Sequence, residues 1–459
     1  MKHFDSVIIG FGKAGKTLAA ALAAAGKSVA LIERSPAMYG GTCINVACIP
    51  TKALEYNARL SAAAADAHDT FERKAARYRT AVAEKRVLTA MLRKKNLEKL
   101  QNAGVTVLTG TASFISETGV SVALNGGGTE TLEADTIVIN TGSLPFVPPI
   151  EGLNGNRFVH TSESLMELDE LPARMIVIGG GYIGMEFASL YANFGTEVTV
   201  VQDGAEFLPR EDAQISAAVR QHLENRGVKI IAGARILSVR EDGEHALVTV
   251  QTENGQQELG AEAVLVATGR RPNLEALHPE AAGIELTERG AVKTDEHLRT
   301  SVPHIFAAGD VAGGLQFTYI SLDDSRILKS QLLGTADRTT KNRGAVPYSV
   351  FMDPPLSRVG LTEAEARAAG YDVAIASLPA AAVPKAHILK QSAGLLKAVV
   401  DSRTGLILGA HLFCAESHEL INLVKLAIDA KLPYTQLRDG IFTHPTMSEA
   451  LNDLFAALP

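Results

Sequence analysis

Near its N-terminus the chain reads Ile8-Ile9-Gly10-Phe11-Gly12-Lys13-Ala14-Gly15, a glycine triplet that follows an apolar run and precedes an alanine-rich segment. This pattern predicts a strand, a tight turn and a helix whose N-terminus attracts phosphate groups. A second apolar run, residues 28–32, ends at Glu33, 18 residues past Gly15, where a carboxylate can bind ribose hydroxyls. We therefore predict a Rossmann-like dinucleotide site built on Gly10, Gly12, Gly15 and Glu33.

The same design recurs about 170 residues later, around residues 175–202. An apolar run leads into Gly179-Gly180-Gly181-Tyr182-Ile183-Gly184, and the next predicted strand, residues 198–201, ends at Gln202. A neutral Gln202 neither binds a pair of ribose hydroxyls as firmly as a carboxylate nor repels a 2′-phosphate. The second site is therefore predicted to accept NADH and NADPH, unless residues elsewhere, such as Arg210, set the preference.

The chain length and the C-terminal pattern indicate further domains. The 459 residues exceed what one hydrophobic core usually supports. From about residue 342 the pattern changes to a strand at 346–351, a helix starting at 362–365, and a hairpin of strands at 396–400 and 406–412. We predict an α/β chain with two Rossmann-like dinucleotide-binding domains followed by a C-terminal α+β domain.

Composition argues against several classes of partner. The formal net charge of -7 is spread without a basic block, so neither nucleic acid nor an anionic membrane surface is an expected partner. No apolar run reaches the roughly 18 residues that a membrane span needs. The chain opens directly into a predicted strand, so a cytoplasmic location is expected.

Two of the three cysteines stand close together in the segment Thr42-Cys43-Ile44-Asn45-Val46-Ala47-Cys48-Ile49-Pro50. Along a regular helix the two Cα atoms would be too far apart for a disulfide, so a bond requires a distorted segment. Pro50 is one expected cause of the distortion, because it disfavours a helical Ile49. A zinc site is the competing reading, but no second Cys/His pair stands at suitable spacing, so we expect no metal. The third cysteine, Cys414, is expected to be a small buried residue.

Together these residues resemble the pyridine nucleotide-disulfide oxidoreductases, and the likeness covers essentially the whole chain. It extends to the segments 268–273, 305–310 and 444–449. The resemblance implies bound FAD, NAD(P)H as reductant and a homodimer. It also implies an FAD-binding domain at residues 1–145 and 266–338, an NAD(P)-binding domain at 146–265, and a dimerisation domain at 339–459.

The resemblance also implies roles for single residues. Cys43 would attack the substrate, and Cys48 would face the flavin. Lys52 would pair with Glu186 near the flavin ring. His444, oriented by Glu449, would act as acid–base group on the other subunit's disulfide. The implied cofactor-binding residues are Gly10, Gly12, Gly15, Glu33, Gly41, Thr42, Lys52, Thr141, Gly142, Gly179, Gly181, Gly184, Gln202, Gly269, Arg270, Gly309 and Asp310.

Finer features separate the branches of this family. The absence of a cysteine pair near the C-terminus disfavours mercuric reductases, and Lys16 and Thr17 replace the substrate-binding serine and arginine of glutathione reductases. Ala47 replaces the usual glycine between the cysteines. The segments 10–17, 38–43, 317–324 and 354–358 are similar to the bacterial branch that confers resistance to reactive chlorine. That likeness implies a small-molecule oxidant, hypothiocyanous acid, with Cu(II) as a second one. A dihydrolipoamide dehydrogenase and a flavoprotein redox sensor are the alternatives.

Overall fold

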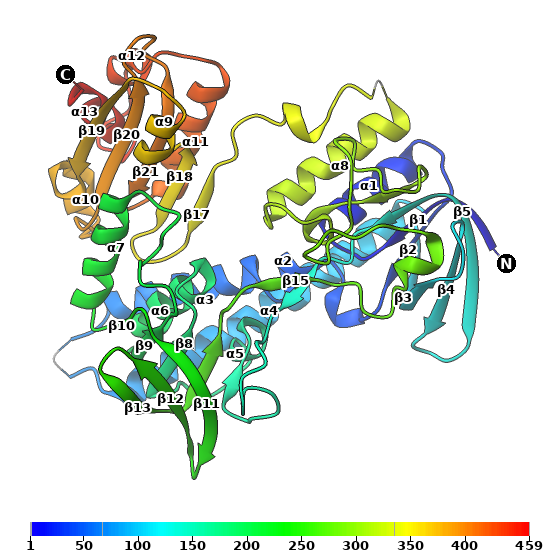
Figure 1. Ribbon diagram of the computed structural model, residues 1–459, viewed down its shortest axis with the longest axis horizontal. Helices are drawn as coiled ribbons and strands as arrows, with labels where there is room; N and C mark the ends of the chain where they lie inside the picture. The colour runs from blue at the N-terminus through cyan, green and yellow to red at the C-terminus, as the bar shows by residue number, and fades with distance from the viewer. Residues whose placement is uncertain (1, 67, 335, 459) are drawn as a thin grey trace. The chain divides into compact units, whose positions relative to one another are not determined.

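The computed structural model describes residues 2–66, 68–334 and 336–458. It divides into two compact units, shown in Figure 1. Unit 1 comprises residues up to 53 with residues 81–146 and 269–343. Unit 2 comprises residues 54–80, 147–268 and 344 onward.

A mixed sheet forms the centre of unit 1. Its parallel strands pair in the order β3, β2, β1, β5, β16, the strand order of a dinucleotide-binding fold, and β4 pairs antiparallel with β3 and β5. A short antiparallel pair, β6 with β15, lies apart from this sheet. The strands are β1 (Lys2–Ile9), β2 (Val29–Glu33), β3 (Thr106–Phe114), β4 (Gly119–Leu124), β5 (Thr129–Ile139), β6 (Ser143–Pro145), β15 (Arg270–Pro272) and β16 (Ile305–Ala307).

Helix α1 (Lys13–Ala24) covers this sheet together with α8 (Thr318–Leu333), and Figure 1 shows the two side by side. Ala14, Leu18 and Leu22 are buried at a spacing of four residues, so one face of α1 packs into the core. The backbone N–H of Ala14 donates to Ser321 Oγ of α8 at 3.0 Å. The start of α1, which carries the glycine triplet, is thereby fixed against α8.

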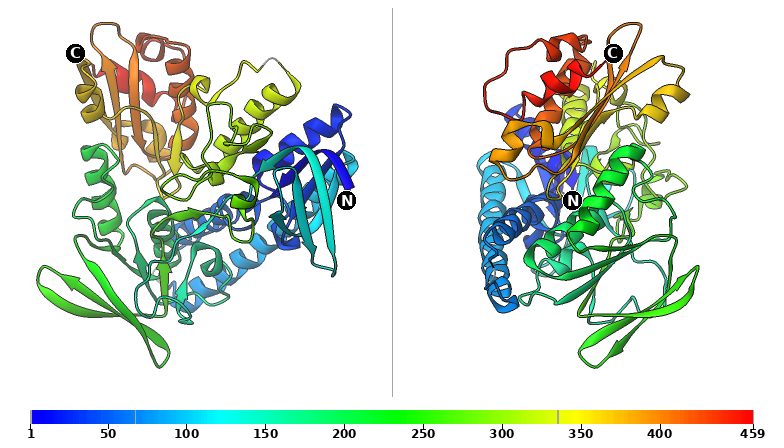
Figure 2. Two further views of the ribbon diagram at one scale, coloured as in Figure 1. Left: turned by 45° about the vertical axis from the view of Figure 1, so that its right-hand side comes forward. Right: turned by 90° about the vertical axis from the view of Figure 1, so that its left-hand side faces the viewer.

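Unit 2 contains a second parallel sheet, in the order β10, β9, β8, β14, β7. Next to it in the chain, β11, β12 and β13 form a separate antiparallel sheet, drawn in green in Figure 2. The strands are β7 (Val159–His160), β8 (Arg174–Ile178), β9 (Glu197–Val201), β10 (Lys229–Ile231), β11 (Arg235–Asp242), β12 (His245–Thr252), β13 (Gly255–Ala261) and β14 (Ala263–Val266).

The C-terminal part of unit 2 is an antiparallel sheet in the order β17, β18, β21, β20, β19. The predicted hairpin is present as β20 and β21, and the predicted helix begins after its N-cap Thr362. The strands are β17 (Tyr348–Val350), β18 (Leu356–Gly360), β19 (Val373–Pro379), β20 (Leu395–Asp401) and β21 (Ile407–Phe413).

The remaining helices connect or cover these sheets. Over the described residues, each helix is too short or too polar to span a bilayer. The α-helices are α2 (Thr42–Asn45), α3 (Cys48–Ala63), α4 (Phe71–Asn102), α5 (Ser162–Leu165), α6 (Tyr182–Phe194), α7 (Ala213–Asn225), α9 (Glu363–Ala368), α10 (Pro384–Ile388), α11 (Ser417–Asp429), α12 (Thr435–Arg438) and α13 (Ala450–Ala456).

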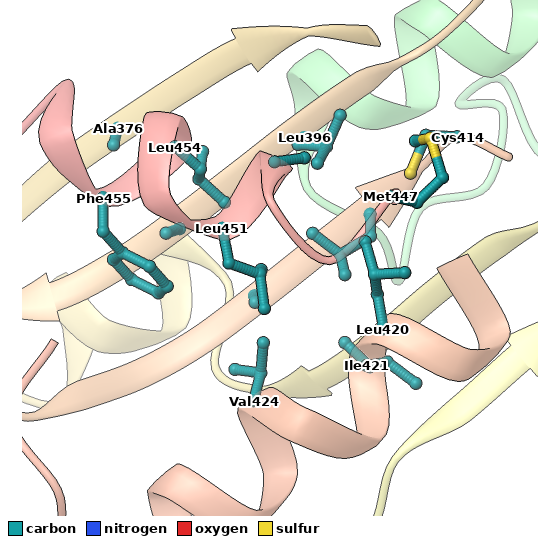
Figure 3. Close-up of a cluster of buried hydrophobic side chains, with 14 of the residues drawn as sticks. Ala376, Leu396, Cys414, Leu420, Ile421, Val424, Met447, Leu451, Leu454 and Phe455 are labelled. Atoms are coloured by element: carbon teal, nitrogen blue, oxygen red, sulfur yellow. The ribbon is translucent and has the colours of Figure 1, made fainter. Parts of the chain in front are cut away.

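Figure 3 shows the core of the C-terminal sheet, where side chains of α11 and α13 point toward one another. Val424 of α11 and Leu451 of α13 are fully buried there. Cys414 belongs to the same core, and burial raises the pKa of its thiol to about 12. The prediction that the third cysteine is a small buried residue is confirmed.

The predicted fold class is therefore confirmed: two dinucleotide-type sheets, one mixed and one parallel, and a C-terminal α+β part are present. The boundaries proposed for the individual domains remain predictions.

Candidate redox-active dithiol site

The two cysteines of unit 1 lie on either side of a break between two helices. Cys43 lies in α2, and α3 begins at Cys48. Between them Val46 leaves the helical region, with φ -140° and ψ 11°. Both cysteines are thiols, half-buried, and a hydrogen bond joins the two side chains. The break therefore brings together two sulfur atoms that a continuous helix would separate.

Pro50 is not the cause of this break. Ile49 is helical, and Pro50 lies in the first turn of α3, where the backbone N–H that proline lacks would have no partner within the helix. The prediction that Pro50 causes the distortion is therefore wrong. The distortion falls at Val46, before Cys48, and Pro50 favours the new helix that starts there.

The pKa of the Cys43 thiol is raised well above its usual range. The main cause is the hydrogen bond to Cys48, and burial adds to it. Thr318, the first residue of α8, places its hydroxyl 3.3 Å from Cys48 Sγ and also lowers the pKa of Cys43. The surroundings of the dithiol thus favour a protonated Cys43.

Backbone contact fixes the dithiol segment against the first glycine triplet. Gly41 has φ +81°, and a Cβ atom on it would lie 2.7 Å from the Cα atom of Gly12. Any side chain at residue 41 would therefore push the two segments apart. The cysteine pair and the dinucleotide loop consequently form one structural unit.

The first glycine triplet forms the tight turn that its sequence predicted. Gly10 has φ +109°, and a Cβ atom on Gly15 would lie 2.6 Å from the Gly10 carbonyl oxygen. Glu33, buried at the end of β2, accepts hydrogen bonds from the backbone N–H of Phe11 at 3.1 Å and of Ser35 at 3.2 Å. Burial raises the pKa of Glu33. Its carboxylate is thus held beside the loop that would carry the phosphates.

Thr141, predicted to bind cofactor, fits a bound FAD. Its Oγ1 atom is buried and has no hydrogen-bond partner among the described residues. A buried hydroxyl without a partner costs free energy, which a ligand oxygen or nitrogen would recover. The next residue, Gly142, has φ +75°, and a Cβ atom on it would lie 3.8 Å from Thr42 Oγ1.

Asp310 and Arg270 each form a hydrogen bond with Ser143. Ser143 donates to Asp310 Oδ2 at 2.7 Å, and Arg270 Nε donates to Ser143 Oγ at 2.8 Å. Gly309, with φ +73°, donates its backbone N–H to Asp324 at 2.7 Å. These contacts orient Asp310 at the end of β16 on the same sheet that carries Glu33. Binding of FAD by Asp310 and Arg270 remains a prediction.

The second glycine triplet lies between β8 and α6 of unit 2. No heavy atom lies within 4 Å of the position that a Cβ on Gly181 would take, leaving room for a ligand. Gln202 is buried, and its Nε2 donates to the carbonyl oxygens of Gly204 and Glu206, both at 2.8 Å. Its amide therefore stabilises its own loop, and its oxygen faces Gly180.

Two pairs of residues were predicted to interact, and the structure describes the first of these pairs directly. His444 Nδ1 lies 2.9 Å from Glu449 Oε1, and the His444 side chain is 71% exposed. A hydrogen bond from the Thr446 N–H and the contact with His444 lower the pKa of Glu449, which favours an ionised carboxylate. Lys52 and Glu186 belong to different units, so their pairing remains a prediction. Glu186 accepts a hydrogen bond from the Phe351 N–H at 2.8 Å.

The sequence reasoning missed several residues of the site. Asn140, directly after β5, accepts a hydrogen bond from the Gly15 N–H at 2.9 Å and donates to the Ala308 carbonyl oxygen at 2.6 Å. Its position between a buried strand and the predicted Thr141 could have indicated it. Ser143, Thr318 and Lys16 were also given no role, because only the folded chain brings them to the site.

The fold and the dithiol define a dinucleotide-dependent disulfide oxidoreductase. A family model described as pyridine nucleotide-disulphide oxidoreductase matches residues 4–325, and the model of its dimerisation domain matches residues 346–455. The chain belongs to this family. It is therefore an FAD- and NAD(P)H-dependent enzyme, and the alternative of a redox sensor is not favoured. Its dimerisation domain supports a homodimer.

Several known proteins of this family are similar to the chain. The chain is 48% identical to the probable pyridine nucleotide-disulfide oxidoreductase RclA of Escherichia coli, over 99% of both chains. It is 36% identical to dihydrolipoyl dehydrogenase of Mycobacterium tuberculosis, over 100% of this chain and 98% of that protein. The structure of the Cu(II) complex of E. coli RclA, a HOCl-induced flavoprotein disulfide reductase, matches with a TM-score of 0.93 at 47% identity, over 99% of both chains.

If Cys48 faces the flavin, reduction of the enzyme by two electrons should produce a long-wavelength absorption band, because a thiolate is a good electron donor to oxidised flavin. Cys48→Ser should lack the band, and Cys43→Ser, which has no disulfide to reduce, should show it before reductant is added and lose it as the flavin is reduced. Anaerobic titration with dithionite, followed by absorbance, measures this. A band that survives in Cys48→Ser would contradict the assignment.

If His444 serves the dithiol of the other subunit, inactive Cys43→Ser and His444→Ala protomers should complement each other. An equal mixture of the two should regain about a quarter of the wild-type sites, because half of the random dimers are mixed and each has one complete site. Steady-state activity after subunit exchange, shown by mass spectrometry, measures this. A mixed dimer without activity would place both residues of one site in one subunit.

At the second dinucleotide site, Gln202→Glu should shift the ratio of specificity constants toward NADH by about tenfold, because a carboxylate repels a 2′-phosphate. Gln202→Met is the control, since it also loses the hydrogen bonds to Gly204 and Glu206 but adds no charge. Its ratio should stay near that of the wild type. Equal shifts in both variants would assign the effect to the loop and not to charge.

Proposed function

We propose that this flavoprotein disulfide reductase reduces hypothiocyanous acid with electrons from NAD(P)H, as a defence against reactive chlorine species. The observation that carries the proposal is the 48% identity, over 99% of both chains, to E. coli RclA, whose structure is described as that of a HOCl-induced disulfide reductase. The half-buried dithiol of Cys43 and Cys48 supplies the chemistry that such an oxidant requires.

The reaction balances over the two thiols. The Cys43 sulfur attacks the sulfur of hypothiocyanous acid, and hydroxide leaves and is protonated to water. Cys48 then attacks the Cys43 sulfur, which forms the disulfide and releases thiocyanate. The dithiol loses two electrons and the oxidant gains them. FAD, when bound, supplies the path for two electrons from NAD(P)H that restores the dithiol.

Contacts within the chain prepare both cysteines for these roles. Cys43 and Cys48 are hydrogen-bonded to each other, so the two thiols that would form the disulfide are neighbours. The Thr318 hydroxyl, 3.3 Å from Cys48 Sγ, can donate to a thiolate there. In the dimer we assign proton transfer to His444, whose Nδ1 is held by Glu449, so that Nε2 remains available to give a proton to the leaving hydroxide.

Cu(II) is a second substrate candidate, because the structure of E. coli RclA is described as a Cu(II) complex. Within one chain, the described residues contain no group of three or more His, Cys, Asp or Glu side chains placed to hold a metal ion. Thiolate sulfur of the dithiol is the soft donor that copper prefers once reduced. We therefore treat Cu(II) as an electron acceptor at the dithiol and not as a resident ion.

Specificity constants decide among these substrates. We expect turnover of hypothiocyanous acid at least about 100-fold more efficient than that of lipoamide or glutathione disulfide, since about 3 kcal/mol of difference in barrier separates a matched from a mismatched substrate. The measurement is NADH and NADPH oxidation with each oxidant and with Cu(II). Cys43→Ser should lose the hypothiocyanous acid activity. Efficient lipoamide turnover with negligible hypothiocyanous acid reduction would make the enzyme a dihydrolipoamide dehydrogenase.

A further inference from the structure

Lys16 is a half-buried cation of unit 1 that none of the roles above uses. It lies in the second turn of α1, and its Nζ donates to the carbonyl oxygen of Gly40 at 2.9 Å. Gly40 stands three residues before Cys43, and its φ of +96° turns that carbonyl oxygen toward α1. The side chain of Lys16 is thereby tied to the segment that carries the dithiol.

The Lys16 ammonium and the Cys43 sulfur act on each other electrostatically. Lys16 is one of the groups that lower the pKa of Cys43, and in return the Cys43 charge raises the pKa of Lys16. Burial is the main reason why the pKa of Lys16 falls to about 8, and Lys13 and Lys99 lower it further by repulsion. At neutral pH Lys16 therefore remains a cation. Because it is partly buried, an anionic neighbour would stabilise its charge.

The other charged and titratable groups around the two side chains can be named element by element. Helix α3 contributes Cys48, and α8 contributes the Thr318 hydroxyl. Helix α4 contributes Lys99 and Arg93, and Arg93 Nε donates to Asn45 Oδ1 of α2 at 2.9 Å. The charged groups among these are positive. The Thr318 hydroxyl and the Lys16 ammonium favour a Cys43 anion, and they work against burial, which disfavours it.

We propose that Lys16 is a positioning residue that stabilises the Cys43 thiolate within its own subunit. Its ammonium supplies the charge that lets Cys43 attack an electrophilic sulfur after the proton has left, and the bond to Gly40 keeps that charge beside α2. This inference deepens the proposed function, on which it rests for the identity of the electrophile. The charge on Cys43 is a property of the protein, so it can be measured without that substrate.

The test uses the flavin-containing dimer with Cys48→Ser as the parent, so that Cys43 is the reactive thiol and its main hydrogen-bond partner is gone. Cys414 is buried with a pKa of about 12 and stays inert. The rate of alkylation by iodoacetamide, in which the Cys43 sulfur displaces iodide and its proton passes to water, is followed against pH. Adding Lys16→Met should slow alkylation near neutral pH by about tenfold, the effect of one partly buried charge at close range.

The effect of Lys16→Met on the alkylation rate should depend on pH. The Lys16 cation is present below its pKa of about 8 and is lost above it, so the difference between the parent and Lys16→Met should shrink as pH rises through that range. Lys16→Arg should retain most of the parent rate, because it keeps the positive charge. Lys99→Met removes an exposed lysine that acts on Lys16, and its alkylation rate should stay within about twofold of the parent.

A second measurement guards against a variant that is only loosely folded. The ratio of the rates with iodoacetate and iodoacetamide reports the local charge, and it should fall in Lys16→Met but not in Lys99→Met. Coincident pH profiles for the parent and Lys16→Met, with flavin absorbance and dimer intact, would overturn the inference. Failure to reduce hypothiocyanous acid would overturn only the proposed substrate, because alkylation measures Cys43 alone.

Discussion

The close backbone approach of Gly41 to Gly12 is the constraint on which the site depends. A Cβ atom at residue 41 would lie 2.7 Å from the Gly12 Cα atom, so glycine is needed at residue 41, where the dithiol segment meets the dinucleotide loop. Since α2 follows directly, this contact sets where Cys43 lies relative to the phosphate-binding turn. The protein therefore fixes the dithiol beside the dinucleotide loop with backbone contact and not with side chains.

Much of this arrangement could be predicted because it depends on local rules. The two glycine triplets, the strands before them and the residues at the ends of the next strands follow from the geometry of a single strand–turn–helix unit. Glu33 and Gln202 were found in this way. The C-terminal hairpin of β20 and β21 was equally visible, since alternating and buried runs separated by turn residues are typical of paired strands.

What could not be predicted depends on contacts between distant segments. Asn140 joins Gly15 to Ala308 across 125 and 168 residues of sequence, and no spacing rule connects these positions. The same holds for Thr318 beside Cys48, 270 residues apart. The error at Pro50 has a different origin: a proline disfavours the helix before it, yet in the first turn of a helix it costs nothing. Which of the two applies depends on where the helix begins.

The electrostatics of the dithiol reconcile two opposing requirements. A resting thiol should be protonated, so that it does not react with every oxidant, and the hydrogen bond of Cys43 to Cys48 raises its pKa for this purpose. An attacking thiol must be an anion, and Lys16 and Thr318 act in that direction. When the proton leaves, the hydrogen bond that protected Cys43 disappears while the cation stays in place. The same segment can therefore hold an unreactive dithiol and, after a single proton transfer, a nucleophile whose charge Lys16 and Thr318 partly compensate.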